Sequence, residues 1–245
     1  MTSDEEIIAQ AVAYARSHRQ RIAREKTDLE RYPREERPIS IFMAGSPGAG
    51  KTEISKEYVA AIDELREEGF DGLGSILRID PDDLREELPG YTGNNSWLFQ
   101  GAVSLLVERI HDLMLKQQQS FILDGTLASL DVARKNVSRS VRRDREVQIF
   151  FVYQQPVLAW QFVCGREKIE GRNIPRESFI RQFLDVPNVV TQIKQEFGER
   201  VALDVIIKDN DGTNQQWETD VASIDDYLPE RYTRKQLEDL LANEV

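Results

Sequence analysis

Apolar and polar residues alternate through the middle of the chain in a pattern that predicts buried strands separated by helices. The predicted strands lie at residues 39–44, 75–80, 120–126, 147–154 and 201–209. The run "VQIFFVYQ" at 147–154 is apolar on both faces. Strands of this kind, joined by helices, are typical of a parallel sheet that helices cover on both sides. We therefore expect an α/β fold, a three-layer sandwich with a mostly parallel central sheet.

Helical spacing of apolar residues fills the segments between these strands. Helices are predicted at 4–31, 51–68, 97–118, 129–143, from 156 onward, at 175–198 and at 234–243. A short helix is predicted in "DDLREEL" and a turn in "NDGTN" at 210–214. Pro33 ends the first helix, and a linker with two prolines follows it. We expect two parts, an N-terminal helical extension at 1–34 and one α/β domain at 35–245.

Charge and hydropathy narrow the range of partners. The chain has 32 Lys and Arg against 43 Asp and Glu, a formal net charge of -11. Sequence-independent binding to nucleic acid needs a basic surface, so we expect no nucleic-acid partner. No segment approaches the roughly 18 apolar residues of a membrane span, and the acidic N-terminus is unlike a signal peptide. We therefore expect a cytoplasmic protein without a membrane partner.

The strand at 39–44 leads into "GSPGAGKT", which fills every position of the G-x-x-x-x-G-K-[ST] motif. Glycines allow backbone N–H groups to surround phosphate oxygens at a helix N-terminus. Lys51 is expected to reach the β- and γ-phosphates, and the Thr52 hydroxyl to bind Mg²⁺. The motif predicts binding of a nucleoside triphosphate, ATP, by residues Gly45, Ser46, Pro47, Gly48, Ala49, Gly50, Lys51 and Thr52. The alternative is a glycine-rich turn that binds nothing.

Carboxylates follow two of the predicted strands, at the sheet edge where ligands bind in such folds. Asp80, Asp82 and Asp83 follow the strand at 75–80, and one of them could accept the proton of an attacking hydroxyl group. The alternative is that Asp82 or Asp83 caps the short helix. Asp124 could support Mg²⁺ or face the acceptor, or it could simply belong to an Asp-Gly turn.

Arginines that could stabilise a transferring phosphoryl group occur late in the chain. Arg166 and Arg172 bracket "EKIEG". Cationic side chains can stabilise the charge on the γ-oxygens in the transition state of phosphoryl transfer. The alternative, which the spacing supports equally well, is that both arginines lie on a solvated helix face. The basic residues of 134–145 are interpreted as a solvated face without a site role.

These motifs, in this order, resemble the zeta toxin family of P-loop kinases over about residues 35–210. "IDPDDLR" resembles the family's I-D-x-D-x-[FL]-[KR] element, whose second Asp is the general base, which points to Asp82 rather than Asp80. "LDGT" is similar to the family's E-G-T element, with Asp124 replacing Glu. Arg166 and Arg172 match the two arginines that members use near the transferred phosphoryl group.

The resemblance implies a reaction and a partner. The reaction is transfer of the ATP γ-phosphoryl group to the 3′-hydroxyl of a UDP-N-acetylhexosamine, and the partner is an antitoxin that blocks the nucleotide site. The resemblance and the positions of the motifs together suggest that the acceptor is bound by Asp80, Glu108, Asp124 and Thr126. The family's arginine after E-G-T is absent here, where Leu127 and Ala128 stand instead, and the loop "PGYTGNNSWLFQ" also differs.

Two alternatives remain open. The first is a P-loop kinase with another hydroxyl acceptor, such as a nucleoside or an antibiotic, which the altered acceptor segment allows. The second is a nucleotide-binding regulatory ATPase that acts through a partner. The N-terminal helix lies outside the resemblance; it could pack on the core as an ordinary helix, or lie near the nucleotide site.

Overall fold

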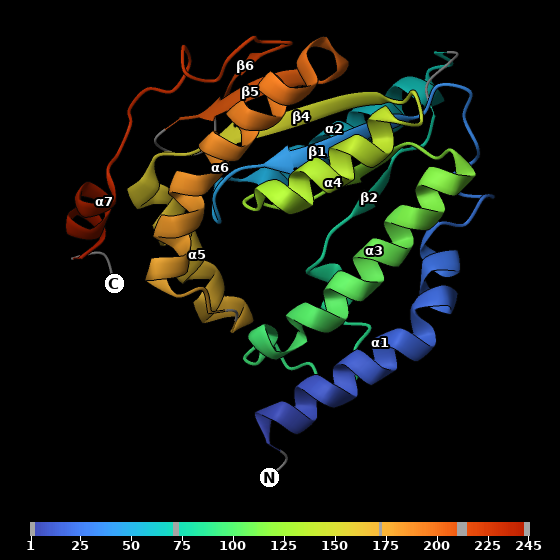
Figure 1. Ribbon diagram of the computed structural model, residues 1–245, viewed down its shortest axis with the longest axis horizontal. Coiled ribbons are helices and arrows are strands. Elements are labelled where there is room, and N and C mark those ends of the chain that lie inside the picture. Colours follow the sequence, from blue (N-terminus) through green and yellow to red (C-terminus); the bar gives the residue numbers. More distant parts are fainter. Residues whose placement is uncertain (1–2, 71–73, 172, 210–214, 243–245) are drawn as a thin grey trace.

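A single mixed sheet forms the centre of the computed structural model, which describes residues 3–70, 74–171, 173–209 and 215–242 (Figure 1). The strand order is β2-β3-β1-β4-β5-β6, and all neighbours are parallel except β5 and β6. The strands are β1 Ile39–Ala44, β2 Leu77–Ile79, β3 Phe121–Leu123, β4 Glu146–Tyr153, β5 Ala202–Lys208 and β6 Gln215–Glu218. The predicted mostly parallel sheet is confirmed.

Helices cover both faces of this sheet, as the sequence predicts. α2 (Lys51–Glu67) packs on one face, and α4 (Leu130–Val141) and α6 (Arg176–Phe197) cover the other (Figure 1). Within β1, Ile41 and Met43 face the α2 side, whereas Phe42 and Ala44 face the larger cluster on the opposite side. This period of two places one apolar row in each layer of the core.

The N-terminal helix α1 (Asp4–Lys26) lies along α3 (Gln100–Gln117) at the outside of the molecule (Figure 1). Ala15 and Ile22 are fully buried there. Across the same contact, Arg109 donates a hydrogen bond to the Gln20 side chain at 2.8 Å. The predicted packing of this helix on the core is confirmed, while the division into parts at residues 34 and 35 stays a prediction.

The remaining helical segments are η1 (Asp83–Arg85), η2 (Ser96–Phe99), α5 (Pro156–Glu170), η3 (Gly198–Arg200) and α7 (Arg234–Leu241). Of these, η1 and α5 follow the C-terminal ends of β2 and β4, whereas η3 directly precedes β5. The segments η1, η2 and η3 are 3₁₀ turns. The helix predicted from Trp97 therefore begins in the 3₁₀ turn η2 and becomes α-helical at Gln100.

Two predicted boundaries were wrong and one strand was missed, each for an identifiable reason. The first helix ends at Lys26 rather than 31, because the side-chain amides of Gln117 and Gln119 bind the Thr27 carbonyl. The third strand ends at Leu123, since the Gly125 N–H turns back to the Leu123 carbonyl at 3.1 Å. The antiparallel edge strand β6 was missed because "QQWE" has little apolar signal. The turn predicted at 210–214 lies outside the described residues.

Candidate active site

The glycine loop between β1 and α2 has the geometry of a phosphate-binding loop. Gly50 is the N-cap of α2, with a φ of 89°, and it has no side chain to cap the helix. Gly48 has a φ of 73°, and a Cβ atom there would lie 2.1 Å from the Ala159 carbonyl oxygen. Only glycine fits such a position. The N–H groups at the start of α2 can therefore bind an anion.

Lys51 is buried against this loop. Its Nζ donates hydrogen bonds to the carbonyl oxygens of Gly45, at 3.0 Å, and Ser46, at 2.7 Å. These bonds hold the ammonium group over the loop that would enclose the phosphates. The side chain is therefore positioned to neutralise phosphate charge, as the motif predicts.

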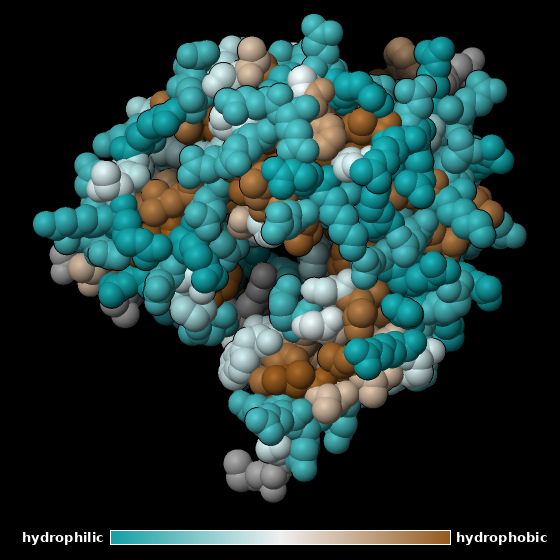
Figure 2. Space-filling model, viewed as in Figure 1, coloured by the Kyte–Doolittle hydropathy of each residue, from teal (hydrophilic) through white to brown (hydrophobic). Residues whose placement is uncertain are grey.

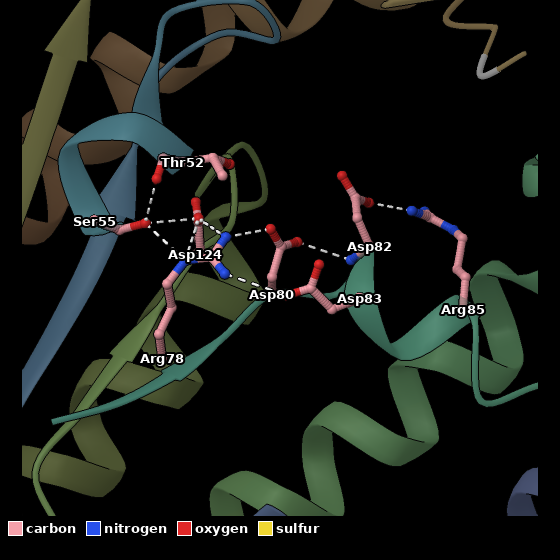
Figure 3. A network of polar contacts seen from close by, with 8 residues as sticks. All are labelled: Thr52, Ser55, Arg78, Asp80, Asp82, Asp83, Arg85 and Asp124. Carbon is pink, nitrogen blue, oxygen red and sulfur yellow. Dashed lines mark hydrogen bonds and ion pairs between the residues drawn. The ribbon is translucent and has the colours of Figure 1, made fainter. Parts of the chain in front are cut away.

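The C-terminal ends of β2 and β3 bring two buried carboxylates together. Ile79 and Leu123 are register partners, so Asp80 and Asp124 follow them at the same edge of the sheet. Arg78 bridges the two, as Figure 3 shows: it forms an ion pair with Asp80 and donates to Asp124 Oδ2 at 2.7 Å. Ser55 of α2 also donates to Asp124 Oδ2, at 2.9 Å. The network ties the carboxylates to the helix that begins at the glycine loop.

Burial and a neighbouring charge alter the acidity of Asp80. Desolvation, and then the negative charge of Asp124, raise its pKa to about 6, while Arg78 opposes the rise. Asp80 Oδ1 accepts the backbone N–H of Asp82 at 2.8 Å. Asp80 is therefore a buried support that orients the next turn of chain, whereas Asp82 stands further out.

Asp82 is held by Arg85 at the open side of this network. The two side chains form an ion pair (Figure 3). Arg85 also donates to the Gln100 side chain at 3.2 Å. The Asp82 side chain is 29% exposed, against 8% for Asp80. Asp83 is also exposed and pairs with Arg78, so Asp82 is distinguished among the aspartates that follow β2 by being both accessible and part of the wall of the cleft beside the glycine loop. This agrees with its predicted role without testing it.

Lys51, Thr52 and Asp82 line a single cleft of about 360 Å³. The surface is hollowed between α5 and the region of η1 and η2, where this cleft opens (Figure 2). Arg166 reaches the cleft from α5, and Asp80, Asp124 and Thr126 line it as well. Arg172 lies outside the described residues, so its predicted role stays a prediction. No residue of α1 is among those lining the described part of the cleft, but α1 contacts η2, whose Ser96 and Trp97 line it, so the suggestion that this helix lies near the nucleotide site stays a prediction.

Glu108 lies in a neighbouring cavity rather than in the cleft. This cavity, of about 650 Å³, lies between α3, α4 and α6, and it shares Gln100, Thr126 and Gln182 with the cleft. Glu108 forms an ion pair with Lys135 at 2.6 Å, and this hydrogen bond lowers its pKa. Leu127 lines the same cavity with a φ of 55°, a strained conformation for a leucine.

The basic residues of α4 and its exit form a solvated face only in part. Lys135, Arg142 and Arg143 are exposed, whereas for Arg139 and Arg145 that interpretation was wrong. The Arg139 side chain is only 16% exposed; it pairs with Asp112 and donates to His111 Nδ1 at 3.2 Å. Lys135 and Arg139 line the cavity beside Thr126. Arg145 is buried and binds the carbonyl groups of Ile39 and Gln119. Tertiary partners, which a periodicity pattern does not reveal, decide these positions.

Three further site residues escaped the sequence interpretation: Arg78, Ser55 and Arg85. Arg78 gave a signal, since a charged residue inside the short apolar run "SILRID" needs a buried partner. Arg85 stands at the basic position of the I-D-x-D-x-[FL]-[KR] element. Ser55 gave none, because serine on a helix is common and its partner is 69 residues away.

The residues at the cleft suit Mg²⁺ bound together with a nucleotide. The Thr52 hydroxyl and the carboxylates of Asp80 and Asp124 border the same space (Figure 3). No group of three or more potential metal ligands was found within the described ranges. Mg²⁺ usually takes one or two protein ligands and completes its shell with phosphate oxygens and water, so this donor set fits.

Comparisons with known proteins agree with this geometry. The sequence model of the zeta toxin family matches residues 22–222. Toxin PezT of Streptococcus pneumoniae serotype 4 is 26% identical over 130 residues, which are 50% of this chain and 47% of the relative. The chain thus covers about half the length of that curated relative. No helix within the described parts of the chain is long and apolar enough to cross a membrane.

Solved structures share the fold at low sequence identity. A structure of the PezAT toxin–antitoxin system of S. pneumoniae matches with a TM-score of 0.62 and 18% identity, covering 95% of this chain and 96% of that one. The AvrRxo1-ORF1:AvrRxo1-ORF2 structure with ATP matches with a TM-score of 0.58 and 14% identity, covering 86% and 65%. The family match spans most of the sequence, including the glycine loop and both aspartate segments. The chain belongs to the zeta toxin family.

Proposed function

We propose that this protein is an ATP-dependent phosphotransferase that transfers the γ-phosphoryl group to a sugar hydroxyl, the 3′-hydroxyl of a UDP-N-acetylhexosamine. One observation carries the proposal: the phosphate-binding residues Lys51 and Thr52 share one cleft with an accessible carboxylate, Asp82. A nucleotide switch needs no such carboxylate, whereas a kinase uses one to accept the proton of the attacking hydroxyl.

In the proposed reaction, the acceptor oxygen forms a bond to the γ-phosphorus while the bond to the β–γ bridging oxygen breaks. The hydroxyl proton passes to Asp82, and ADP leaves. Lys51 and the N–H groups of the glycine loop hold the phosphates, and Arg166 and Arg172 stabilise charge on the transferring group. Thr52, Asp80 and Asp124 would hold Mg²⁺, which neutralises phosphate charge when bound.

The cavity beside the cleft supports an anionic sugar acceptor. Glu108, on α3, lines the cavity and can accept hydrogen bonds from sugar hydroxyls. Lys135 and Arg139, on α4, line the same cavity. These two cations would bind the diphosphate of the acceptor, in place of the family arginine that Leu127 and Ala128 replace. Thr126, shared by cleft and cavity, lies where the two substrates would meet.

The test is transfer from labelled ATP with Mg²⁺ to UDP-N-acetylglucosamine, with Asp83→Asn as the matched control for Asp82→Asn. Both aspartates lie in the same turn, but the Asp83 side chain is 68% exposed and does not line the cleft. We expect Asp82→Asn to lower the transfer rate by about 10²–10⁴-fold with ATP binding retained, and Asp83→Asn to leave most activity. Equal loss in both variants would contradict the role of Asp82.

A panel of other hydroxyl acceptors tests the identity of the acceptor independently of the reaction type. The changed segment at Leu127 and Ala128 favours, as the second candidate, a kinase for another acceptor. Labelling of a nucleoside or an antibiotic instead of the UDP-sugar would support the proposed phosphotransferase activity but contradict the proposed acceptor. Slow ATP hydrolysis without any labelled acceptor would instead support the regulatory ATPase.

Family membership also suggests the protein's context. The solved relatives include a toxin–antitoxin system, so we propose an antitoxin protein as a partner of this chain and the cytoplasm as its location. Co-expression with the product of the adjacent gene, followed by size-exclusion chromatography, would test the partnership.

A further inference from the structure

A further cavity, separate from the cleft and from the cavity around Glu108, lies beside the glycine loop. It has a volume of about 440 Å³ and is bounded by the end of β4, by α6 and by the segment at 225–232. This segment passes α6 on its way to α7 (Figure 1). Among the described residues it shares no lining residue with the cleft, although Ser46 of the glycine loop forms part of its wall. Its size suits a small organic ligand.

One wall of the cavity contains a proline inside a helix. Pro187 lies inside α6 and lines the cavity, as does Phe183 one turn earlier. Because proline has no N–H, it cannot donate the hydrogen bond that the Phe183 carbonyl would receive in a regular helix. A carbonyl in this position can accept a hydrogen bond from a ligand.

Aromatic rings and a carboxylate make the cavity attractive to a cation. The ring of Phe183 lies 6.0 Å from that of Tyr153 and 6.1 Å from that of Tyr232, measured between centroids. Glu230 accepts a hydrogen bond from the Tyr232 hydroxyl and has no cationic partner within 4.0 Å in the described part of the chain. The other lining carboxylate, Asp225, is already paired with Arg231.

The same surroundings disfavour a negatively charged ligand. Burial, and then the charge of Glu230, raise the pKa of Tyr153 to about 12, so this wall resists additional negative charge. Aromatic faces attract cations, and an uncompensated carboxylate strengthens that attraction. The apolar side chains of Phe183, Val186 and Leu228 would contact the body of the ligand.

We propose that this cavity is a second ligand site, separate from the active site, which binds a small organic ammonium ion with an aromatic or apolar body. The ammonium group would lie near Glu230, with the Phe183 carbonyl as a further acceptor. The proposal does not depend on the phosphotransferase activity, since Glu230 and the aromatic residues lie outside the proposed catalytic set. Among the described lining residues, Ser46 alone belongs to the predicted nucleotide-binding loop.

The test is isothermal titration calorimetry of the full chain with phenethylamine. The uncharged 2-phenylethanol and the anionic phenylacetate have the same body and serve as matched ligands. We expect phenethylamine to bind about tenfold more tightly than 2-phenylethanol, the ratio that about 1.4 kcal/mol of cation–π and ionic attraction gives, and phenylacetate to bind least. Equal affinity for amine and alcohol, or no binding of the amine at millimolar concentration, would overturn the proposal.

Variants of the lining residues test whether phenethylamine binds in this cavity. Glu230 is exposed to solvent, so Glu230→Gln should fold normally and weaken phenethylamine binding about tenfold. Asp226→Asn is the control, because Asp226 is also exposed, lies four residues away and does not line the cavity. Thr191→Phe, which fills the cavity, should abolish binding. Phenethylamine binding that is unchanged in Glu230→Gln, or lowered equally in Asp226→Asn, would show that the protein's general negative charge attracts the amine.

Discussion

Arg78 lies between two carboxylates that would otherwise repel each other inside the protein. Its side chain is 13% exposed, and those of Asp80 and Asp124 are 8% and 2% exposed. A buried pair of like charges is tolerated only with a compensating cation. The residue therefore joins stability to function, since the carboxylates that it holds also border the proposed phosphate site.

Replacement of Arg78 should destabilise the fold in a pH-dependent manner. We expect Arg78→Met to lower the free energy of unfolding by about 3 kcal/mol or more at pH 8, because two buried carboxylates lose their partner. Without Arg78 the pKa of Asp80 would rise further, so protonation at pH 5 should recover part of the loss. Urea denaturation of the variant and of the unmodified protein at pH 8 and pH 5 measures these changes in the free energy of unfolding.

The control for this prediction is Arg66→Met. Arg66 pairs with Asp63 on the surface of α2, and both side chains are more than one third exposed. Such pairs contribute little, so we expect a change within about 0.5 kcal/mol. A loss in Arg78→Met as small as in Arg66→Met would contradict the prediction, and an equal loss at pH 8 and pH 5 would mean that Arg78 acts through its packing and not through its charge.

His111 provides a second prediction about a single residue. It is 1% exposed, and burial, and then the charge of Arg139, lower its pKa to about 3. The unfolded chain then binds a proton at this residue between about pH 6.5 and 3, whereas the folded protein does not, so this contribution to stability is lost as the pH falls through that range. Asp80, whose pKa is raised, acts in the opposite direction between about pH 4 and 6.

Replacing His111 isolates its own contribution. We expect His111→Gln to reduce the loss of stability between pH 6.5 and pH 5 by about 2 kcal/mol relative to the unmodified protein, since one proton per molecule is no longer linked to unfolding. The Asp80 contribution is present in both proteins and cancels in the comparison. Parallel stability curves for the two proteins over this pH range would contradict the buried neutral state of His111.

At the scale of elements, α1 belongs to the packed core of the molecule. Its buried residues face α3, and the carbonyl of Thr27 at its end receives hydrogen bonds from Gln117 and Gln119. Its buried side consists mainly of alanines, Ala11, Ala15 and Ala23, which explains why its sequence alone has only a modest amphipathic pattern. Because this contact buries small alanines closely against α3, it should tolerate no larger polar group.

Two alanines on α1 provide a matched test of this packing. Ala15 is 0% exposed, whereas Ala13, two residues away on the same helix, is exposed. We expect Ala15→Glu to lower the free energy of unfolding by several kcal/mol, since a carboxylate would be buried without a partner. Ala13→Glu should change it by about 0.5 kcal/mol or less. Equal stability of the two variants in thermal denaturation would show that α1 does not hold the fold together.

At the scale of the whole molecule, the sequence was informative where local pattern and topology coincide. The continuous apolar run "VQIFFVYQ" predicts a buried strand, and the glycines of the loop at 45–52 predict strand, turn and helix in one order. The parallel sheet then places Asp80 beside Asp124. Where side chains find distant partners, the pattern was silent. Arg139 and Arg145 have the spacing of surface residues in a helical pattern, yet each is satisfied by groups from other segments.

The same distinction applies to the two sides of the proposed active site. The phosphate side follows from one contiguous motif, so the sequence alone is enough to predict it. The acceptor side is assembled from α3, α4 and the segment at 126–128. Its cations, Lys135 and Arg139, come from a helix that the family motifs do not include, so only the fold brings them to Thr126.

Nucleotide binding should stabilise the whole molecule, and this separates binding from catalysis. A ligand at 100 times its Kd stabilises the folded state by about 2.7 kcal/mol, which corresponds to a rise in Tm of about 5–10 °C for a chain of this size. We expect ATP with Mg²⁺ to produce such a shift in the unmodified protein and in Asp82→Asn, and a much smaller one in Lys51→Met. Lys51 contacts the glycine loop at Gly45 and Ser46, so the Tm of Lys51→Met without nucleotide is the necessary reference. A full ATP shift in Lys51→Met would mean that the loop binds the phosphates without its lysine, whereas loss of the shift in Asp82→Asn would make Asp82 a binding residue and not the base.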